Sequence, residues 1–457
     1  MLPLMLTLLA TGPEGPIRLH PDNPHYLLFR GKPTVLITSG EHYGAVLNLD
    51  FDYVPYFAEL ASKGLNLTRT FSGVYCEAPG SFNIRNNTLA PKKGRLICPW
   101  ARSDTEGYAN GGNKFDLERW DPEYFQRLRH FVGEAGRQGI VVELVLFCPF
   151  YKDEMWALSP MNARNNVNGI GAMPRKEAHT LKHKDLLAVQ ERFVRKVVSE
   201  LKDFDNLYYE ICNEPYFGGV TLPWQKRIAA TIVDAEHHLP RKHLIAQNIA
   251  NGRKKVSSPD PNVSILNFHY ATPPDTVAMN YGLNRPIGDD ETGFKGGKDA
   301  TYRGEGWEFI LAGGAIYSNL DYSFTPAKED GSATPHAPGG GGATLRSQLK
   351  ILKTFIGGFT FIAMKPDNRV IRGGVPDKAR AWALVQPGRQ YAIYIRGGDR
   401  ATLTLELPEG PYKADWVNTK TGAVDKTETF DHSGGPKPLA SPRYSSDVAL
   451  RVLSTRK

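Results

Sequence analysis

Short β-branched runs alternate with longer helical segments from about residue 17 to residue 365, and this alternation limits the possible folds more than any other feature. It is typical of parallel strands joined by crossover helices. The runs predicted to be strands are, in chain order, Thr34–Thr38, Asn66–Phe71, Ile140–Phe147, Leu207–Cys212, Leu244–Gln247, Ile265–His269, Pro286–Asp290 and Ala315–Leu320.

The segments between these runs are predicted to be helices. They include Pro55–Lys63, Pro122–Gln138, Lys184–Leu201, Leu222–His238 and Gly304–Ala312, and Leu345–Phe355 or the segment after it would complete the ring. Eight strand–helix units of this kind predict an α/β fold, a (β/α)8 TIM barrel. A doubly wound open sheet is the rival, but no Gly-x-Gly-x-x-Gly sequence follows the first strand. Arg18–Pro33 is expected to form a small hairpin across the bottom of the barrel.

The pattern changes after about residue 370. Short alternating runs follow one another without helical segments, which is typical of an antiparallel β-sandwich. These runs are Trp382–Val385, Tyr391–Arg396, Ala401–Leu405, Tyr412–Val417, Ala423–Thr429 and Val448–Val452. We therefore divide the chain into a tail or residual signal (1–16), a catalytic barrel (17–368) and a C-terminal β-sandwich (369–457).

Charge and targeting signals limit the partners. The net charge of +8 is spread over the chain, its densest cluster is only Arg253-Lys254-Lys255, and no zinc-finger or recognition-helix pattern occurs, so we expect no nucleic-acid partner. Met1–Ala10 is apolar but too short to span a bilayer, so we expect no membrane insertion. It lacks the basic start of a signal peptide. A signal shortened by a misplaced start codon would still make the protein secreted or periplasmic.

The four cysteines form no Cys-x-x-Cys pair, so neither a metal cluster nor a redox pair is expected. Cys148 and Cys212 read as small buried hydrophobic residues. A bridge between Cys76 and Cys98 is an open alternative for an exported protein. The run Gly339–Gly342 lacks a following Lys-Ser or Lys-Thr, so it is predicted to be a loop and not a phosphate site, and we expect no cofactor.

Two of the predicted strands end at glutamates. Asn213-Glu214-Pro215 follows one run, and Asp289-Asp290-Glu291-Thr292-Gly293-Phe294 ends another. In a barrel the active site is built at the carboxyl ends of the strands, so Glu214 and Glu291 are expected to meet across one cleft. A pair of carboxyl groups flanking one bond is what a glycosidase requires.

The other predicted strand ends also carry polar or aromatic side chains. An arginine within an apolar strand needs a buried anion, which favours a functional Arg69. Trp156 and Tyr151, with Phe150 and Trp307, are candidates for stacking on a sugar ring. The supporting residues expected at the site are Glu41, His42, Arg69, Tyr151, Trp156, Asn213, Gln247, His269, Tyr270 and Asp321.

Together these motifs resemble clan A of the retaining β-glycoside hydrolases, and especially the family-five cellulase-like enzymes. The segment from Phe115 to Pro122 is also similar to the lead-in to the third helix of such proteins. The resemblance covers about residues 20 to 370 in organisation. It implies that Glu214 is the acid/base and Glu291 the nucleophile. It also implies supporting roles: Asn213 would bind the sugar 2-hydroxyl, Arg69 would brace the nucleophile, and Tyr270 or His269 would contact it.

The sequence departs from that family in two places. His269 and Tyr270 are adjacent, with no residue between them, which leaves open which of the two approaches Glu291. The eighth strand offers Asp321 and Tyr322 where clan A enzymes usually present a tryptophan.

Elementary electrostatics supports the same roles. Arg69 near Glu291 would keep that carboxylate ionised with a low pKa, and its negative charge would keep a proton on Glu214. Period-two alternation places Asp289 on the face of Glu291 and turns Asp290 into the helical layer. Glu143 is interpreted either as a buried, paired acid or as a sign that the predicted register of its strand is wrong. In neither case is it given a catalytic role.

The sequence thus predicts a metal-independent retaining β-glycoside hydrolase that cleaves plant- or microbial-type poly- or oligosaccharides by double displacement. The alternative is a catalytically inactive barrel that binds polysaccharide, with the sandwich as an accessory module. A metal-dependent hydrolase would need a His-x-His strand end, for which Glu41-His42 is too little.

Overall fold

The computed structural model describes residues 15–336 and 338–456. The apolar start Met1–Ala10, interpreted above as a remnant of a signal, lies outside the described residues. Among the described residues, no helix is long and apolar enough to cross a membrane.

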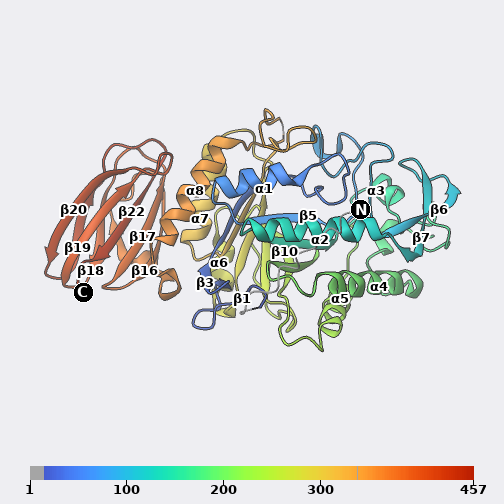
Figure 1. Ribbon diagram of the computed structural model, residues 1–457. Coiled ribbons are helices and arrows are strands. Elements are labelled where there is room, and N and C mark those ends of the chain that lie inside the picture. Colours follow the sequence, from blue (N-terminus) through green and yellow to red (C-terminus); the bar gives the residue numbers. More distant parts are fainter. Residues whose placement is uncertain (1–14, 337, 457) are drawn as a thin grey trace, which may run out of the picture.

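Eight parallel strands form the predicted barrel (Figure 1). They are β4 (Leu36–Gly40), β5 (Leu67–Phe71), β8 (Val141–Phe147), β9 (Leu207–Cys212), β10 (Ile245–Asn251), β11 (Ile265–His269), β12 (Ile287–Thr292) and β13 (Ile316–Leu320). Each strand pairs with the next from β5 to β13, and β13 pairs with β4. At the last seam, Asn66 joins β4 to β5, because its Oδ1 accepts from the amide of Ile37 at 3.0 Å. The α/β barrel is therefore confirmed.

Helices surround the strands. They are α1 (Tyr53–Ser62), α2 (Pro122–Arg137), α3 (Asp153–Leu158), α4 (Lys184–Leu201), α5 (Leu222–Ala235), α6 (Asp275–Asn280), α7 (Asp299–Leu311) and α8 (Ala343–Gly357). The start of α2 shows how the sequence sets these bounds. The Asp121 carboxylate accepts from the amides of Glu123 and Tyr124, and Pro122 occupies the first turn. The face of α2 that carries Phe131 is buried against the barrel.

The segment before the first barrel strand forms the expected cover at the amino end of the barrel. It consists of β1 (Arg18–Leu19), β2 (Leu27–Phe29) and β3 (Lys32–Thr34), paired antiparallel. Arg30 joins it to the barrel through Asp205, which precedes β9 (Nε–Oδ2 2.6 Å).

One hairpin was not predicted. β6 (Trp100–Glu106) pairs with β7 (Asn113–Trp120) ahead of α2, so most of the segment from Phe115 to Pro122 is strand. Charged residues interrupt the apolar alternation in both strands, because much of the hairpin is exposed. That exposure removes the pattern by which a strand is recognised.

The C-terminal residues form the predicted antiparallel β-sandwich, which lies beside α7 and α8 (Figure 1). One sheet contains β14 (Lys365–Pro366), β16 (Arg380–Gln386), β17 (Gln390–Arg396), β22 (Asp447–Ser454), β19 (Gly410–Val417) and β20 (Val424–His432). The other contains β15 (Ile371–Gly373), β18 (Thr402–Leu407) and β21 (Gly435–Ala440). Edge strand β21 was missed, because prolines weaken its strand pattern. Trp416 and Leu405 are among the fully buried side chains of the sandwich core.

All four cysteines are buried and free, so the bridge considered between Cys76 and Cys98 does not form. Burial raises the pKa of each of these two thiols to about 12, which leaves both protonated and unreactive.

Candidate active site

A cavity of about 430 Å³ opens at the carboxyl ends of the barrel strands. Its walls come from strand ends and from the loops that follow them. The lining residues are His42, Tyr43, Phe71, Glu77, Phe82, Leu89, Cys148, Tyr151, Asn213, Glu214, Phe217, Asn251, Tyr270, Glu291, Phe294 and Lys295.

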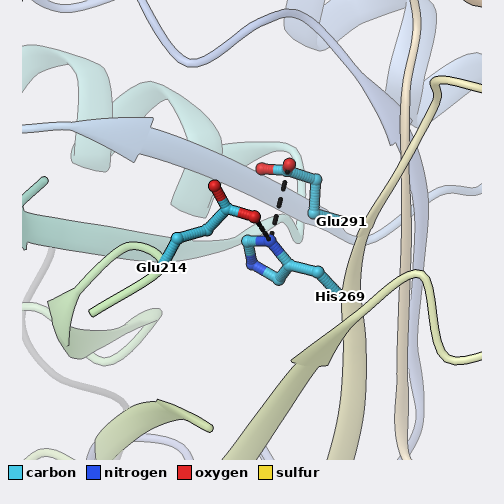
Figure 2. Close-up of side chains that lie close together, drawn as sticks. All are labelled: Glu214, His269 and Glu291. Atoms are coloured by element: carbon cyan, nitrogen blue, oxygen red, sulfur yellow. Dashed lines mark hydrogen bonds and ion pairs between the residues drawn. The ribbon is translucent and has the colours of Figure 1, made fainter. Parts of the chain in front are cut away.

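Glu214 and Glu291 converge in this cavity, as expected from their strand ends. One carboxylate oxygen of each lies within 4.8 Å of the other and of a ring nitrogen of His269. Figure 2 shows both side chains directed at His269, whose Nδ1 is 3.2 Å from Glu214 Oε1 and 3.5 Å from Glu291 Oε1. Glu214 adopts a positive φ of 35°, a strained backbone that turns it inward directly after β9.

Glu291 lies in an environment that favours its ionised form. Tyr270 Oη donates to Oε1 at 2.5 Å, and Arg69 Nη1 donates to Oε2 at 3.3 Å. Burial alone would raise the pKa of Glu291, but the charge and hydrogen bond of His269, the charge of Arg69 and the hydrogen bond from Tyr270 outweigh it. The pKa of Glu291 is therefore well below its ordinary value.

Glu214 is held by neutral hydroxyl groups as well as by His269. Tyr151 donates to Oε2 at 2.6 Å, and Tyr216 donates to Oε1 at 3.2 Å. Asn213 links the two sides, because its Nδ2 donates to the Tyr151 hydroxyl at 2.9 Å and its Oδ1 accepts from Arg69 at 2.7 Å. One hydrogen-bonded network thus connects Glu214 to Glu291.

The expected orientations of Asp289 and Asp290 were wrong. Phe268 pairs with Asp289 and His269 pairs with Glu291, so Asp290 is an extra residue in β12. This bulge breaks the alternation. Asp290 faces the barrel interior, where it contacts Arg69 at 3.2 Å. Asp289 instead accepts from the Ala271 amide and interacts electrostatically with Glu305 of α7.

Six residues expected at the site do not line the cavity. Two of them, Arg69 and His269, still contact Glu291, and the other four make contacts elsewhere. Glu41 accepts from the amides of Gly44 and Ala45. Trp156 is 5% exposed, packs on Phe150 and donates to a backbone carbonyl. The other two, Gln247 and Asp321, bind Gln225 of α5 and Arg346 of α8.

Trp156 lies in α3, and Gln247 lies within β10 because that strand continues to Asn251. Glu41 and Asp321 share one cause. A side chain next to a strand end can turn toward the helical layer as well as toward the cleft, and the sequence does not distinguish the two directions. Phe150 and Trp307 are also buried away from the cavity, each 1% exposed or less.

Several cavity residues were not predicted, because they lie in loops without periodicity. Glu77 and Phe82 follow β5, Phe217 follows β9, and Lys295 follows β12. Phe294 could have been identified from the sequence, since it is the last residue of the Glu-Thr-Gly-Phe motif. Phe217 and Phe294 are 43% and 37% exposed, so both offer apolar faces at the cavity.

His42 and Glu77 form a second charged contact in the wall, with Nε2 and Oε2 3.6 Å apart. Burial would lower the pKa of His42, but Glu77, Glu291 and Glu41 outweigh it and raise that pKa. The wall of the cavity therefore pairs a histidine whose protonated form is favoured with nearby carboxyl groups.

Two groups of side chains have the spacing of metal ligands: Glu214, His269 and Glu291, and below them Glu143, Glu210 and Asp290. Arg69 lies among the lower three, with Nη2 2.5 Å from Glu210 and Nε 3.2 Å from Asp290. Its guanidinium already supplies the positive charge that such a cluster needs.

The comparisons with known proteins agree with this fold. No protein-family model matches the sequence, and a search of curated proteins finds no match. A candidate glycoside hydrolase from Bacteroides vulgatus ATCC 8482 is similar in structure, with a TM-score of 0.68 at 15% identity over 97% of this chain and 83% of that one. A glycoside hydrolase family 5 structure from the same organism has a TM-score of 0.64 at 16% identity over 97% of this chain and 93% of that one. At these identities the likeness establishes the fold that the two proteins and this chain have in common.

Proposed function

We propose that the protein is a retaining β-glycoside hydrolase in which Glu214 is the acid/base and Glu291 the nucleophile. The observation that carries the proposal is the meeting of these two carboxyl groups in one cavity, with oxygens within 4.8 Å. Retaining enzymes place their two carboxyl groups about 5–5.5 Å apart, whereas inverting enzymes leave about 6.5–9.5 Å for a water molecule.

The environments of the two groups support different roles. Glu291 is kept ionised by Arg69, Tyr270 and His269, as a nucleophile requires. Its carboxylate would attack the anomeric carbon while protonated Glu214 gives its proton to the departing oxygen. Water, deprotonated by the Glu214 carboxylate, would then release the sugar from Glu291 and restore the proton to Glu214.

Asn213 would bind the sugar 2-hydroxyl beside this reaction. Its amide is fixed on both sides, by Arg69 at Oδ1 and by the Tyr151 hydroxyl at Nδ2. A fixed dipole costs little reorganisation when charge develops on the ring in the transition state. Phe217 and Phe294 would pack against the apolar faces of sugar rings at the cavity.

Aryl β-glycosides test the proposal directly. A panel of glucoside, mannoside, xyloside, galactoside and glucuronide should reveal turnover of at least one member. Glu291→Ala should lose nearly all activity and regain part of it with azide, which can replace the missing nucleophile. Glu214→Ala should lose about 10²–10⁴-fold on substrates with poor leaving groups. Proton NMR of the first product should show the retained anomer.

Three results would contradict the proposal. Inverted first products would exclude the double displacement. Absence of azide rescue in both variants would contradict the roles assigned to Glu214 and Glu291. Polysaccharide binding without turnover of any glycoside would favour the inactive binding barrel.

A further inference from the structure

A layer of buried carboxyl groups lies directly beneath the cavity. Glu143 on β8, Glu210 on β9 and Asp290 on β12 each place an oxygen within 4.8 Å of the others, and none is exposed. Arg69 is the cation among them. The reaction proposed above uses none of these three carboxyl groups, so their burial calls for another explanation.

Asp290 connects this layer to the cavity through His269. Its Oδ2 is occupied, because it lies 3.2 Å from Arg69 Nε and accepts from Asn267 Nδ2 at 3.1 Å. Its Oδ1 lies 3.6 Å from His269 Nε2. Both of these atoms are buried, and neither has a hydrogen-bond partner within residues 15–336 and 338–456. A donor and an acceptor left buried and unpaired are costly, and a small side-chain rotation would join these two.

Both nitrogens of His269 therefore face carboxylate oxygens. Nδ1 faces Glu214 and Glu291 in the cavity, and Nε2 faces Asp290 beneath it (Figure 2 shows the cavity side). A neutral imidazole carries one N–H, so it could satisfy both sides only if a facing carboxyl group donated a proton to its other nitrogen, whereas an imidazolium donates from both nitrogens.

We propose that Asp290 is a positioning residue that holds His269 as an imidazolium, so that a positive charge stands between Glu214 and Glu291. In this arrangement Nε2–H donates to Asp290, and Nδ1–H donates to the Glu291 carboxylate and to Oε1 of Glu214, which an un-ionised carboxyl group can also offer as an acceptor. The proposal rests on the function proposed above and adds a source for the charge that keeps Glu291 ionised.

The surrounding charges favour this state. Burial would lower the pKa of His269, but Glu291, Asp290 and Glu214 outweigh it and raise that pKa well above its ordinary value. Burial and the charge of Glu210 raise the pKa of Asp290, and the charges of Arg69 and His269 oppose that rise. The titratable and charged groups that interact with Asp290 and His269 are Arg69 from β5, Glu143 from β8, Glu210 and Glu214 from β9 and its loop, Asp289 and Glu291 from β12, and Tyr43, Tyr208, Tyr216 and Tyr270.

Asp290→Asn tests the role with almost no change of shape. Because Asn267 donates to Oδ2 and the cationic Arg69 lies beside it, the asparagine should turn its oxygen to them and its NH₂ group to His269. That NH₂ group cannot accept from Nε2–H, so the ring should become neutral. Asp289→Asn is the matched control, since Asp289 is the neighbouring buried acid and hydrogen-bonds to the Ala271 amide instead.

Nitrogen-15 NMR of histidine-labelled protein reads the ring directly, with His269→Asn used to assign its signals. The wild-type protein and Asp289→Asn should show protons on both ring nitrogens from pH 5 to 7, and Asp290→Asn should show one. If Asp290→Asn does not fold, the wild-type spectrum alone decides. A neutral His269 in the wild-type protein, or a doubly protonated one in folded Asp290→Asn, would overturn the proposal.

Kinetics supply a separate readout. Loss of the imidazolium should move the acid limb of kcat/KM in Asp290→Asn to higher pH by about one unit, the effect of removing one adjacent opposite charge. Asp289→Asn should leave the limb in place, and an unmoved limb in Asp290→Asn would also contradict the proposal. Because the NMR result needs no substrate, it stands even if no glycoside is hydrolysed, which would contradict only the proposed function.

Discussion

At the scale of single residues, Glu291 is held through both of its oxygens. Tyr270 donates to Oε1 at 2.5 Å and Arg69 donates to Oε2 at 3.3 Å. The sequence left open which member of the pair His269-Tyr270 approaches this carboxylate. Both do, because His269 ends β11 and Tyr270 follows it with a positive φ of 54°, which turns its side chain back toward the cavity.

Removal of the Tyr270 hydroxyl should change the pH dependence of activity. The hydrogen bond stabilises the ionised form of Glu291, and its pKa should therefore rise in Tyr270→Phe. A hydrogen bond to a charged group contributes about 1.5–3 kcal/mol, equivalent to a rise of about one to two pKa units. Since Glu291 acts only when ionised, the acid limb of kcat/KM should move to higher pH by that amount.

Tyr322→Phe is the matched control for this change. Tyr322 is also a nearly buried tyrosine after a barrel strand, and its hydroxyl has no hydrogen-bond partner in the described part of the chain. Its loss should leave the acid limb in place. Equal shifts in both variants would mean that the effect comes from packing and not from the Tyr270 hydrogen bond.

At the scale of elements, the barrel strands were predictable and their side-chain directions were only partly so. Runs rich in aliphatic and aromatic residues, such as Leu207–Cys212, mark a strand buried on both faces, and the structure begins and ends β9 at these residues. The bulge in β12 turns the Asp290 side chain into the barrel interior. No sequence pattern predicts this bulge, because it depends on the pairing of β12 with β11.

The candidate site was predictable to a similar degree. Side chains at strand ends, such as Arg69 and Asn213, were identified because parallel strands end at one edge. Glu77 and Phe82 were not, since a loop carries them to the cavity and tertiary contacts alone fix its course. Glu143 was interpreted as a paired acid or a misplaced register. It is a buried acid that accepts from Tyr208 and Asn267.

Glu41, in the loop after β4, should make the free energy of unfolding depend on pH. Burial raises the pKa of Glu41 to about 7, although hydrogen bonds from Thr88, Gly44 and Ala45 favour its ionised form. Between the ordinary pKa of a glutamate, 4.5, and about 7, the folded protein keeps a proton that the unfolded chain has lost. The free energy of unfolding should therefore fall as pH rises through this window, and this contribution should stay constant above it.

Glu41→Gln should remove this dependence. At about 1.4 kcal/mol per pH unit, the fall attributable to Glu41 is roughly 3 kcal/mol, and a glutamine cannot contribute it. Denaturant unfolding from pH 4.5 to 8 should show the variant gaining stability relative to the wild-type protein as pH rises to 7. Parallel curves for the two proteins would show that Glu41 is ionised in the folded state throughout.

At the scale of the whole molecule, the barrel and the sandwich meet through a buried polar interface on α7. Arg303, 2% exposed, binds Asp447 of β22 at 2.6 Å and 2.9 Å. Trp307 stacks on Tyr394 of β17, with ring centroids 5.3 Å apart. These contacts tie the two parts together, since separation would break the Arg303–Asp447 pair and expose the apolar Trp307–Tyr394 contact to water.

Asp447→Ala should therefore destabilise both parts of the molecule at once. It leaves Arg303 buried without its anion, a loss of about 3–5 kcal/mol in the free energy of unfolding. We expect calorimetry to show one unfolding transition in the wild-type protein and a clearly lower Tm for that transition in the variant. Thermal inactivation of any glycosidase activity should shift with it, because the active site lies on the same cooperative unit. Arg443→Ala is the control, since its ion pair with Asp399 is exposed and should contribute little. A variant in which only a separate sandwich transition moved would show that the two parts unfold independently.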